Sequence, residues 1–248
     1  MTRRFQTYLP GLLILGLWAV LPAPAAAQEA AAEEIGLCAA ETPVMNPWTR
    51  KKPAGWWLKR HEEILALPGR NEVQIAFIGD SITDGWDNAG LKVWEKEYVP
   101  LKPLNLGIDC DSTQHVLWRL DHGEMDNLPK LKVVVIEIGT NNQGITRDPP
   151  EDIAKGVEAI CGRVKQKAPQ AKILIMAIFP KRFGAIKHDV ANGLIAKLAD
   201  DKQIFYMDIN EALVTGKGFA DWVGHLNETG FQIWADQIRP QIEKLMKD

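Results

Sequence analysis

A short apolar run, Ile75–Ile78, leads directly into Gly79-Asp80-Ser81 and constrains the fold more than any other stretch of the sequence. A continuous apolar run closed by a glycine is typical of a strand buried on both faces of a parallel sheet. In open α/β sheets, ligands bind just beyond the carboxyl ends of the strands. The sequence therefore places Ser81 where such folds keep their chemistry. The alternative is that Ser81 only caps the helix that follows.

The same strand-like pattern recurs along the chain and alternates with helical stretches. We expect strands at residues 73–78, 101–106, 131–138, 171–177 and 203–207. We expect helices at residues 55–67, 112–122, 151–167, 185–199 and 228–246. His61 lies among charged residues in the first of these helices, so we expect it on a solvated face. Strands that alternate with helices predict βαβ units. The expected fold class is therefore α/β, a three-layer α/β/α sandwich around a five-stranded parallel sheet, formed by one domain over residues 55–248.

The beginning of the chain differs in character from the rest. Two arginines precede an apolar run over residues 8–20, and a stretch rich in proline and alanine follows up to Ala27. A basic start, a short apolar run and a small-residue site predict a signal peptide over residues 1–27. The alternative, a membrane anchor, needs about 20 apolar residues. We therefore expect export to the periplasm or the medium, no membrane span after cleavage, and a tether or loosely packed arm over residues 28–54.

The charge of the chain argues against a nucleic-acid partner. The net charge is −3, and removal of Arg3 and Arg4 with the signal peptide takes it to −5. Proteins that bind nucleic acids usually carry a basic stripe. The cysteine count is odd and leaves at least one thiol unpaired within a monomer. The spacing of the three cysteines, Cys38, Cys110 and Cys161, matches no metal motif.

Polar residues follow most of the expected strands. Asp80 and Ser81 come after the first strand, and residues 105–113 come after the second. Residues 139–142 follow the third strand, and residues 221–227 lie beyond the fifth. Because strand ends of one polarity share an edge of a parallel sheet, we expect these clusters to converge at that edge.

The converging residues include the groups that acyl transfer requires. A nucleophilic Ser81 hydroxyl needs a base to take its proton, and His225 is the candidate. The tetrahedral intermediate carries an oxyanion, which needs N–H donors held in place in advance. The candidate donors are the side-chain amide of Asn141 and the backbone N–H groups of Ser81 and Cys110. Together these groups predict a site for ester hydrolysis.

Each candidate also has a purely structural interpretation. Asn141 can be a turn residue that satisfies its own backbone. His225 can be a surface histidine, and Asn227 can be the N-cap of the last helix. A different chemistry, metal-dependent phosphoester hydrolysis, has weak support from four carboxylates at the strand ends, because no histidine-containing ligand spacing accompanies them. These carboxylates are Asp80, Asp84, Asp109 and Asp111.

Several of these stretches resemble a known family. Residues 79–82 (Gly-Asp-Ser-Ile), 139–142 (Gly-Thr-Asn-Asn) and 225–227 (His-Leu-Asn) resemble three signature blocks of the GDSL (SGNH) hydrolases. The stretch 111–124 is more specific and resembles the catalytic subunits of platelet-activating-factor acetylhydrolase and their bacterial relatives. The similarity extends from about Trp56 to the C-terminal helix.

The resemblance implies a flavodoxin-like sandwich and serine ester hydrolysis with no metal and no cofactor. It also implies that Ser81 is the nucleophile, His225 the base and Asn141 an oxyanion donor. The relatives form dimers, so the resemblance is consistent with a homodimer.

Two positions depart from the family pattern. The family has glycine directly before the Asp-Ser-Thr of its second block, where this chain has Cys110 preceded by the acidic Asp109. The family carries the triad aspartate three residues before the histidine, where this chain has Trp222. The nearest carboxylate, Asp221, lies four residues before His225. We expect it to accept a hydrogen bond from the imidazole through a bulged loop; the alternative is that a backbone carbonyl orients the ring.

These observations favour an exported serine esterase. The expected substrates are short acyl esters, with acetyl as the favoured group, on small molecules or on glycans. Because the two departures fall on the oxyanion loop and the triad acid, weak activity is part of this expectation. The alternative is a fold whose site has degraded at Cys110 and near Trp222 and which acts as a non-catalytic glycan-binding module.

Overall fold

The computed structural model describes residues 37–47, 52–180, 188–221 and 223–247. The expected signal peptide, residues 1–27, lies outside these residues. Of the helices in the described part of the chain, none is long and apolar enough to cross a membrane.

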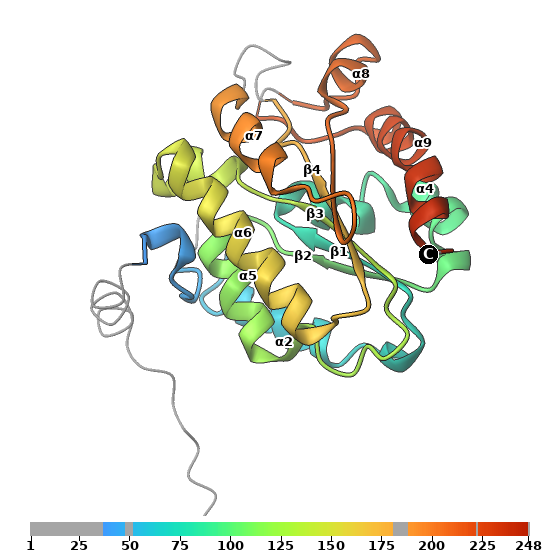
Figure 1. The fold of residues 1–248 in the computed structure, drawn as a ribbon, viewed down its shortest axis with the longest axis horizontal. Helices are drawn as coiled ribbons and strands as arrows, with labels where there is room; N and C mark the ends of the chain where they lie inside the picture. Colours follow the sequence, from blue (N-terminus) through green and yellow to red (C-terminus); the bar gives the residue numbers. More distant parts are fainter. Residues whose placement is uncertain (1–36, 48–51, 181–187, 222, 248) are drawn as a thin grey trace, which may run out of the picture.

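Five parallel strands form one sheet at the centre of the molecule (Figure 1). The strands are β1 (Ile75–Gly79), β2 (Pro103–Gly107), β3 (Val133–Glu137), β4 (Lys172–Met176) and β5 (Ile204–Met207). Their order in the sheet is β2-β1-β3-β4-β5. The chain therefore places β2 on one side of β1, and then β3, β4 and β5 in succession on the other side. In a sheet of this order, the crevice between the carboxyl ends of β1 and β3 is the topological switch point where ligands bind.

Helices cover both faces of the sheet (Figure 1). Four helices lie on one face: α2 (Trp56–Leu65), α5 (Thr113–Arg119), α6 (Pro150–Lys167) and α7 (Asp189–Ile195). The other face is covered mainly by α4 (Leu91–Glu97), α8 (Asn210–Thr215) and α9 (Glu228–Leu245). Successive strand side chains point to opposite faces, so β1 contributes Ala76 and Ile78 to the first layer and Ile75 and Phe77 to the second. The predicted three-layer α/β/α sandwich is confirmed.

A cluster of aromatic side chains fills the second layer behind the end of β1. Phe77 packs edge to face against Trp94 and Tyr98, at ring-centroid distances of 5.1 and 4.7 Å. Trp86 lies 5.1 Å from Trp234 of α9. Aromatic pairs in these arrangements add to the free energy gained from burying their area. The strand that leads to Ser81 is therefore held rigidly from one side.

Two expectations differ from the structure. His61 was expected on a solvated helix face, but it is 3% exposed and its Nδ1 lies 2.8 Å from Glu124 Oε1. Part of the expected arm, residues 37–47, packs against the domain. Thr113 Oγ1 donates to Ala40 O at 2.9 Å, and the backbone N–H of Val44 donates to Gln114 O at 3.2 Å.

Candidate active site

Ser81 begins a short helix, α3 (Ser81–Asp84), directly after β1. Asp80, and not Ser81, caps this helix, because Asp80 Oδ1 accepts the N–H of Ile82 at 2.9 Å. The turn is tight: a Cβ atom at Gly79 would lie 2.1 Å from Thr83 Oγ1 and 2.2 Å from the carbonyl oxygen of Glu137. Only glycine fits there, and the Ser81 hydroxyl is free from capping to face the site.

The Ser81 hydroxyl, the His225 imidazole and the Asp221 carboxylate lie in line. Ser81 Oγ is 3.0 Å from His225 Nε2, and His225 Nδ1 is 2.7 Å from Asp221 Oδ2. The side chains of His225 and Asp221 are 41% and 38% exposed, so solvent reaches the pair. The expected contact between Asp221 and His225 is present.

A turn around the Asp221 carboxylate explains its unusual spacing. Asp221 Oδ1 accepts the backbone N–H groups of Val223, Gly224 and His225 at 3.0, 3.1 and 3.1 Å. These bonds occupy Oδ1 and leave Oδ2 for the imidazole. Burial alone would raise the pKa of Asp221, but the hydrogen bonds from His225 and these backbone groups outweigh burial and lower it. The carboxylate is therefore held in the ionised form that can orient an imidazole.

Backbone contacts close the loop that carries this turn. Phe219 and Leu226 form an isolated antiparallel bridge, and the N–H of Ala220 donates to the carbonyl of His225 at 2.7 Å. The Asn227 side chain accepts the N–H of Gly230 at 2.8 Å and caps α9, as the structural interpretation predicted. These contacts therefore fix the end of the loop, which carries His225, against the start of α9.

Cys110 lies on the loop after β2 with a left-handed backbone, at φ 65°. This region favours glycine, which is the residue that the family has there. The side chain is 2% exposed, and its Sγ donates to Asp109 Oδ1 at 3.2 Å. The Lys52 ammonium lies 2.7 Å from Asp109 Oδ2. Burial alone would raise the pKa of Asp109, but the hydrogen bonds from Lys52 and Cys110 outweigh it, so the pKa is lowered and the charge near the site is paired.

Asn141, which follows β3, bridges the two loops. Its Nδ2 donates to the carbonyl oxygen of Asp111 at 2.9 Å and to Asp80 Oδ2 at 3.2 Å. Both amide hydrogens thus have acceptors, and the group lies between the strand end that carries Ser81 and the loop that carries Cys110. To donate to an oxyanion, the amide must give up one of these bonds; the bond to Asp80 is the longer.

Two buried carboxyl groups lie behind the nucleophile. Asp80 and Glu137 are both fully buried, and Glu137 is the register partner of Gly79. Burial raises the pKa of Asp80 to about 7. Burial and the neighbouring Asp80 charge raise the pKa of Glu137 well above its ordinary value. Glu137 is not among the residues predicted from the sequence, although a glutamate inside an apolar strand was a visible signal.

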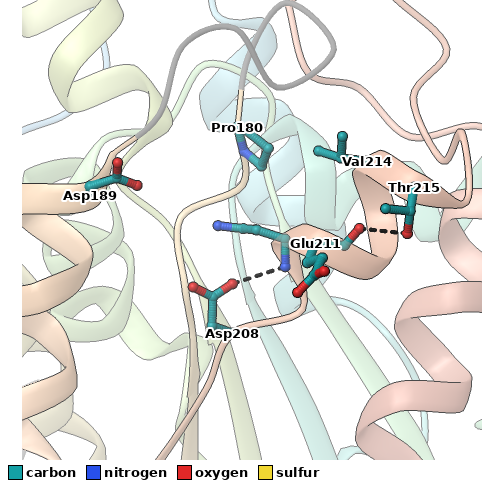
Figure 2. Close-up of a pocket in the computed structure, with 7 residues that line it drawn as sticks. Pro180, Asp189, Asp208, Glu211, Val214 and Thr215 are labelled. Carbon is teal, nitrogen blue, oxygen red and sulfur yellow. Dashed lines mark hydrogen bonds between the residues drawn. The ribbon is translucent and has the colours of Figure 1, made fainter.

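A cavity of about 480 Å³ opens elsewhere on the molecule, beside α8 (Figure 2). Among the residues that the structure describes, none that lines it belongs to the Ser81, His225 and Asp221 set. They are Pro180, Asp189, Asp208, Asn210, Glu211, Val214 and Thr215. The carboxylate of Asp208 accepts the N–H of Asn210 at 2.9 Å (Figure 2), so it serves the local turn.

The phosphoesterase alternative gains no support from the geometry. Asp111 bonds to Arg119, Asp109 to Lys52, and Asp80 to Ile82 and Asn141. Within the part of the chain that the structure describes, no three or more His, Cys, Asp or Glu side chains are grouped so that they could hold a metal ion.

The sheet order and the aligned hydroxyl, imidazole and carboxylate are those of an α/β protein with a Ser–His–Asp arrangement. Comparison with known families is in agreement. The model of the GDSL-like lipase/acylhydrolase family matches residues 77–233, and the chain belongs to this family.

Similar proteins include the alpha1 subunit of platelet-activating factor acetylhydrolase IB from Bos taurus. It is 35% identical over 142 residues, which cover 55% of this chain and 59% of that protein. The chain thus spans about three fifths of the length of this relative. The fold is similar to that of a GDSL-like lipase from Bacteroides thetaiotaomicron, with a TM-score of 0.58 and 19% identity over 75% of this chain and 97% of that one. It is also similar to a carbohydrate esterase family 3 protein from Talaromyces cellulolyticus, with a TM-score of 0.57 and 17% identity over 71% of this chain and 99% of that one.

Proposed function

We propose that this protein is a serine esterase that cleaves carboxylic esters through an acyl-serine intermediate. The observation that carries the proposal is the continuous set of contacts from Ser81 Oγ to His225 Nε2 at 3.0 Å and from His225 Nδ1 to Asp221 Oδ2 at 2.7 Å. Such a set supplies a nucleophile, a base and a group that holds the base in the required tautomer.

In the proposed reaction, His225 Nε2 takes the Ser81 proton while Oγ attacks the ester carbonyl. The Asp221 carboxylate stabilises the imidazolium that forms. The backbone N–H groups of Ser81 and Cys110 and the Asn141 amide are the proposed donors to the oxyanion. His225 then protonates the departing alkoxide. Water attacks the acyl-serine with His225 again as base, which releases the acid and restores the Ser81 hydroxyl.

Short acyl groups, acetyl foremost, are the proposed substrates, on small molecules or on glycans. Support comes from similar proteins, which include an acetyl esterase and a carbohydrate esterase among the solved structures and an acetylhydrolase subunit among the sequence relatives. We also propose that the enzyme is exported, on the basis of the signal-like residues 1–27.

The test is turnover of a chromogenic acetyl ester by the mature protein, with and without a chelator. We expect turnover that the chelator does not change and that Ser81→Ala abolishes. Thr215→Ala, which removes an exposed hydroxyl on α8, is the matched control and should keep the wild-type rate. Equal rates for Ser81→Ala and wild type would refute the serine mechanism. No turnover by the wild type would instead support the binding module.

A further inference from the structure

A buried guanidinium outside the triad has three different partners. Arg119, at the end of α5, is 0% exposed. Its Nε donates to Asp111 Oδ2 at 2.7 Å, and its Nη2 donates to the carbonyl oxygen of Gly79 at 3.3 Å. Its Nη1 contacts Glu124 Oε2. The planar fork of arginine is suited to holding several acceptors in fixed directions.

Two of these partners are attached to the candidate active site. Gly79 ends β1 and immediately precedes Asp80 and Ser81. Asp111 follows Cys110, and its own carbonyl oxygen accepts the Asn141 amide at 2.9 Å. A single side chain therefore connects the strand end that carries the nucleophile with the loop that carries the proposed oxyanion donors.

The other carboxylate oxygen of Asp111 is held from the opposite side. Trp57 Nε1 of α2 donates to Asp111 Oδ1 at 2.6 Å, and Asn46 Nδ2 donates to the same oxygen at 3.1 Å. Asn46 Nδ2 also lies 3.0 Å from the carbonyl oxygen of Cys110. The loop thus has bonds to β1 through Arg119, and to α2 and the segment 37–47 through Asp111.

Stability alone does not account for this cluster. Asp111, Arg119 and Glu124 are all 0% exposed, and removing charges from water offsets much of the attraction between them. Replacing a buried ion pair with apolar side chains is often neutral or stabilising. The best-attested use of buried ionic groups is to specify one arrangement over others. In this protein the buried ionic groups connect the end of β1, which carries Ser81, with the loop that carries Cys110 and Asp111. Both segments must lie beside the same reacting atom of the substrate.

We propose that Arg119 is a positioning residue that sets the distance between the Ser81 strand end and the Cys110–Asp111 loop, and hence the geometry of the oxyanion site. This role rests on the proposed esterase function. A lysine keeps the charge, but its donors sit on one compact ammonium in place of the planar fork, so it cannot reach Asp111, Glu124 and the Gly79 carbonyl in their separate directions at once.

The test compares Arg119→Lys with two controls. Arg163→Lys makes the same change in an exposed pair, where Arg163 Nε lies 2.8 Å from Asp121 Oδ1. Ile160→Val truncates a buried side chain of α6 and controls for lost stability. The measurements are kcat and KM for an acetyl ester, and backbone hydrogen exchange over residues 78–82 and 108–113.

For Arg119→Lys we expect kcat to fall about 10- to 100-fold, because misplacement by about 1 Å has a cost of that order. KM should change less than about threefold, since binding in the ground state is not the target. Exchange in both segments should rise at least about tenfold above the Ile160→Val level, because loss of the bonds that connect the two segments lets both open more often. Arg163→Lys should match wild type in all three measurements.

Exchange that rises no further than in Ile160→Val would overturn the proposal, as would an unchanged kcat. If Arg119→Lys does not fold, Trp57→Phe decides, because it removes the 2.6 Å donor to Asp111 and keeps an aromatic ring beside His61 and Trp118. It should raise exchange over residues 108–113 and lower kcat; wild-type values in both would refute the proposal. If the wild type hydrolyses no ester, the proposed function fails, while the exchange comparison still decides whether Arg119 positions the two segments.

Discussion

The backbone at Cys110 adopts a conformation that favours glycine, yet a buried side chain is present. At φ 65° the Cβ atom is crowded, at a cost of roughly 1–2 kcal/mol for most residues. The thiol contacts Asp109, and the Asp109 charge is paired with Lys52. The departure from the family glycine therefore leaves the loop in the conformation that glycine would adopt, and its N–H remains a candidate oxyanion donor.

We expect Cys110→Gly to keep or raise the rate of ester turnover. Glycine relieves the strain at positive φ and adds conformational freedom to the unfolded chain, so the free energy of unfolding should change by no more than about 1 kcal/mol. The measurements are kcat and chemical denaturation. Cys161→Ala, at a buried thiol on α6, is the control for loss of a sulfhydryl. A large fall in kcat for a folded Cys110→Gly variant would mean that the thiol takes part in the reaction.

We expect Asp221→Asn to lower kcat by about 10²–10⁴-fold. The amide can stabilise the wrong imidazole tautomer and cannot balance an imidazolium charge. Asp208→Asn is the control, because that carboxylate accepts the backbone N–H of Asn210 at 2.9 Å and serves the local turn. A change in kcat of less than severalfold for Asp221→Asn would make Asp221 a bystander, with the 2.7 Å contact irrelevant to turnover.

All five strands could be predicted from the sequence, and most of them are nearly continuous apolar runs; β2, Pro-Leu-Asn-Leu-Gly, is the exception. Every residue of β1 and β3 is buried, so both strands read as short apolar runs in the sequence, as strands buried on both faces do. The long helices α6 and α9 were predicted to within about one or two residues. The short helices α4 and α8 were not, because seven or six residues carry too little periodicity and their helical form depends on packing against α9.

The site was predictable where strand ends or sequence neighbours place its residues, and not where it depends on other long-range contacts. Ser81 follows β1, and Asp221 reaches His225 within one turn, so both could be placed from the sequence. His61 was expected in solvent because its neighbours are charged; its partner Glu124 is 63 residues away. Arg119 was missed for the same reason, since its contact with Gly79 joins residues 40 positions apart.

The close approach of α9 to the preceding loop gives a prediction about stability. A Cβ atom at Gly230 would lie 2.1 Å from the carbonyl oxygen of Gly218, so Gly230→Ala should destabilise the protein by about 1–3 kcal/mol through overpacking. Gly162 on α6 has no atom within 4 Å of such a Cβ. Gly162→Ala should therefore stabilise the helix by about 0.5–1 kcal/mol.

Denaturant titration of both glycine variants measures these opposite signs. Equal midpoints for Gly230→Ala and wild type would show that the loop and α9 can move apart without cost. That result would also mean that the His225 loop is not held firmly at the point where it joins α9.

The buried carboxyl pair makes the stability of the whole molecule depend on pH. An aspartate in the unfolded chain titrates near 3.8, whereas burial raises the pKa of Asp80 to about 7 in the folded protein. Between these values the folded protein binds a proton that the unfolded chain does not. The contribution of Asp80 to the free energy of unfolding is therefore largest near pH 4 and is lost as the pH rises through 7.

We expect the difference in free energy of unfolding between wild type and Asp80→Asn to shift against the wild type as the pH rises from 4 to 8. Asparagine does not titrate, so the slope of this difference reports Asp80. Asp236→Asn, at an exposed position on α9, is the control. A difference that is constant with pH would mean that Asp80 does not bind a proton in the folded protein near neutral pH.

The Asp221 turn also bears on how the site forms as the chain folds. Asp221 and His225 are four residues apart in a loop that closes on itself, so their contact requires little loop-closure entropy. The contact between Ser81 and His225 joins residues 144 positions apart and requires the sheet and α9 to be in place. The acid and base can thus pair early through local contacts, whereas the nucleophile meets them only when the most distant parts of the chain have come together.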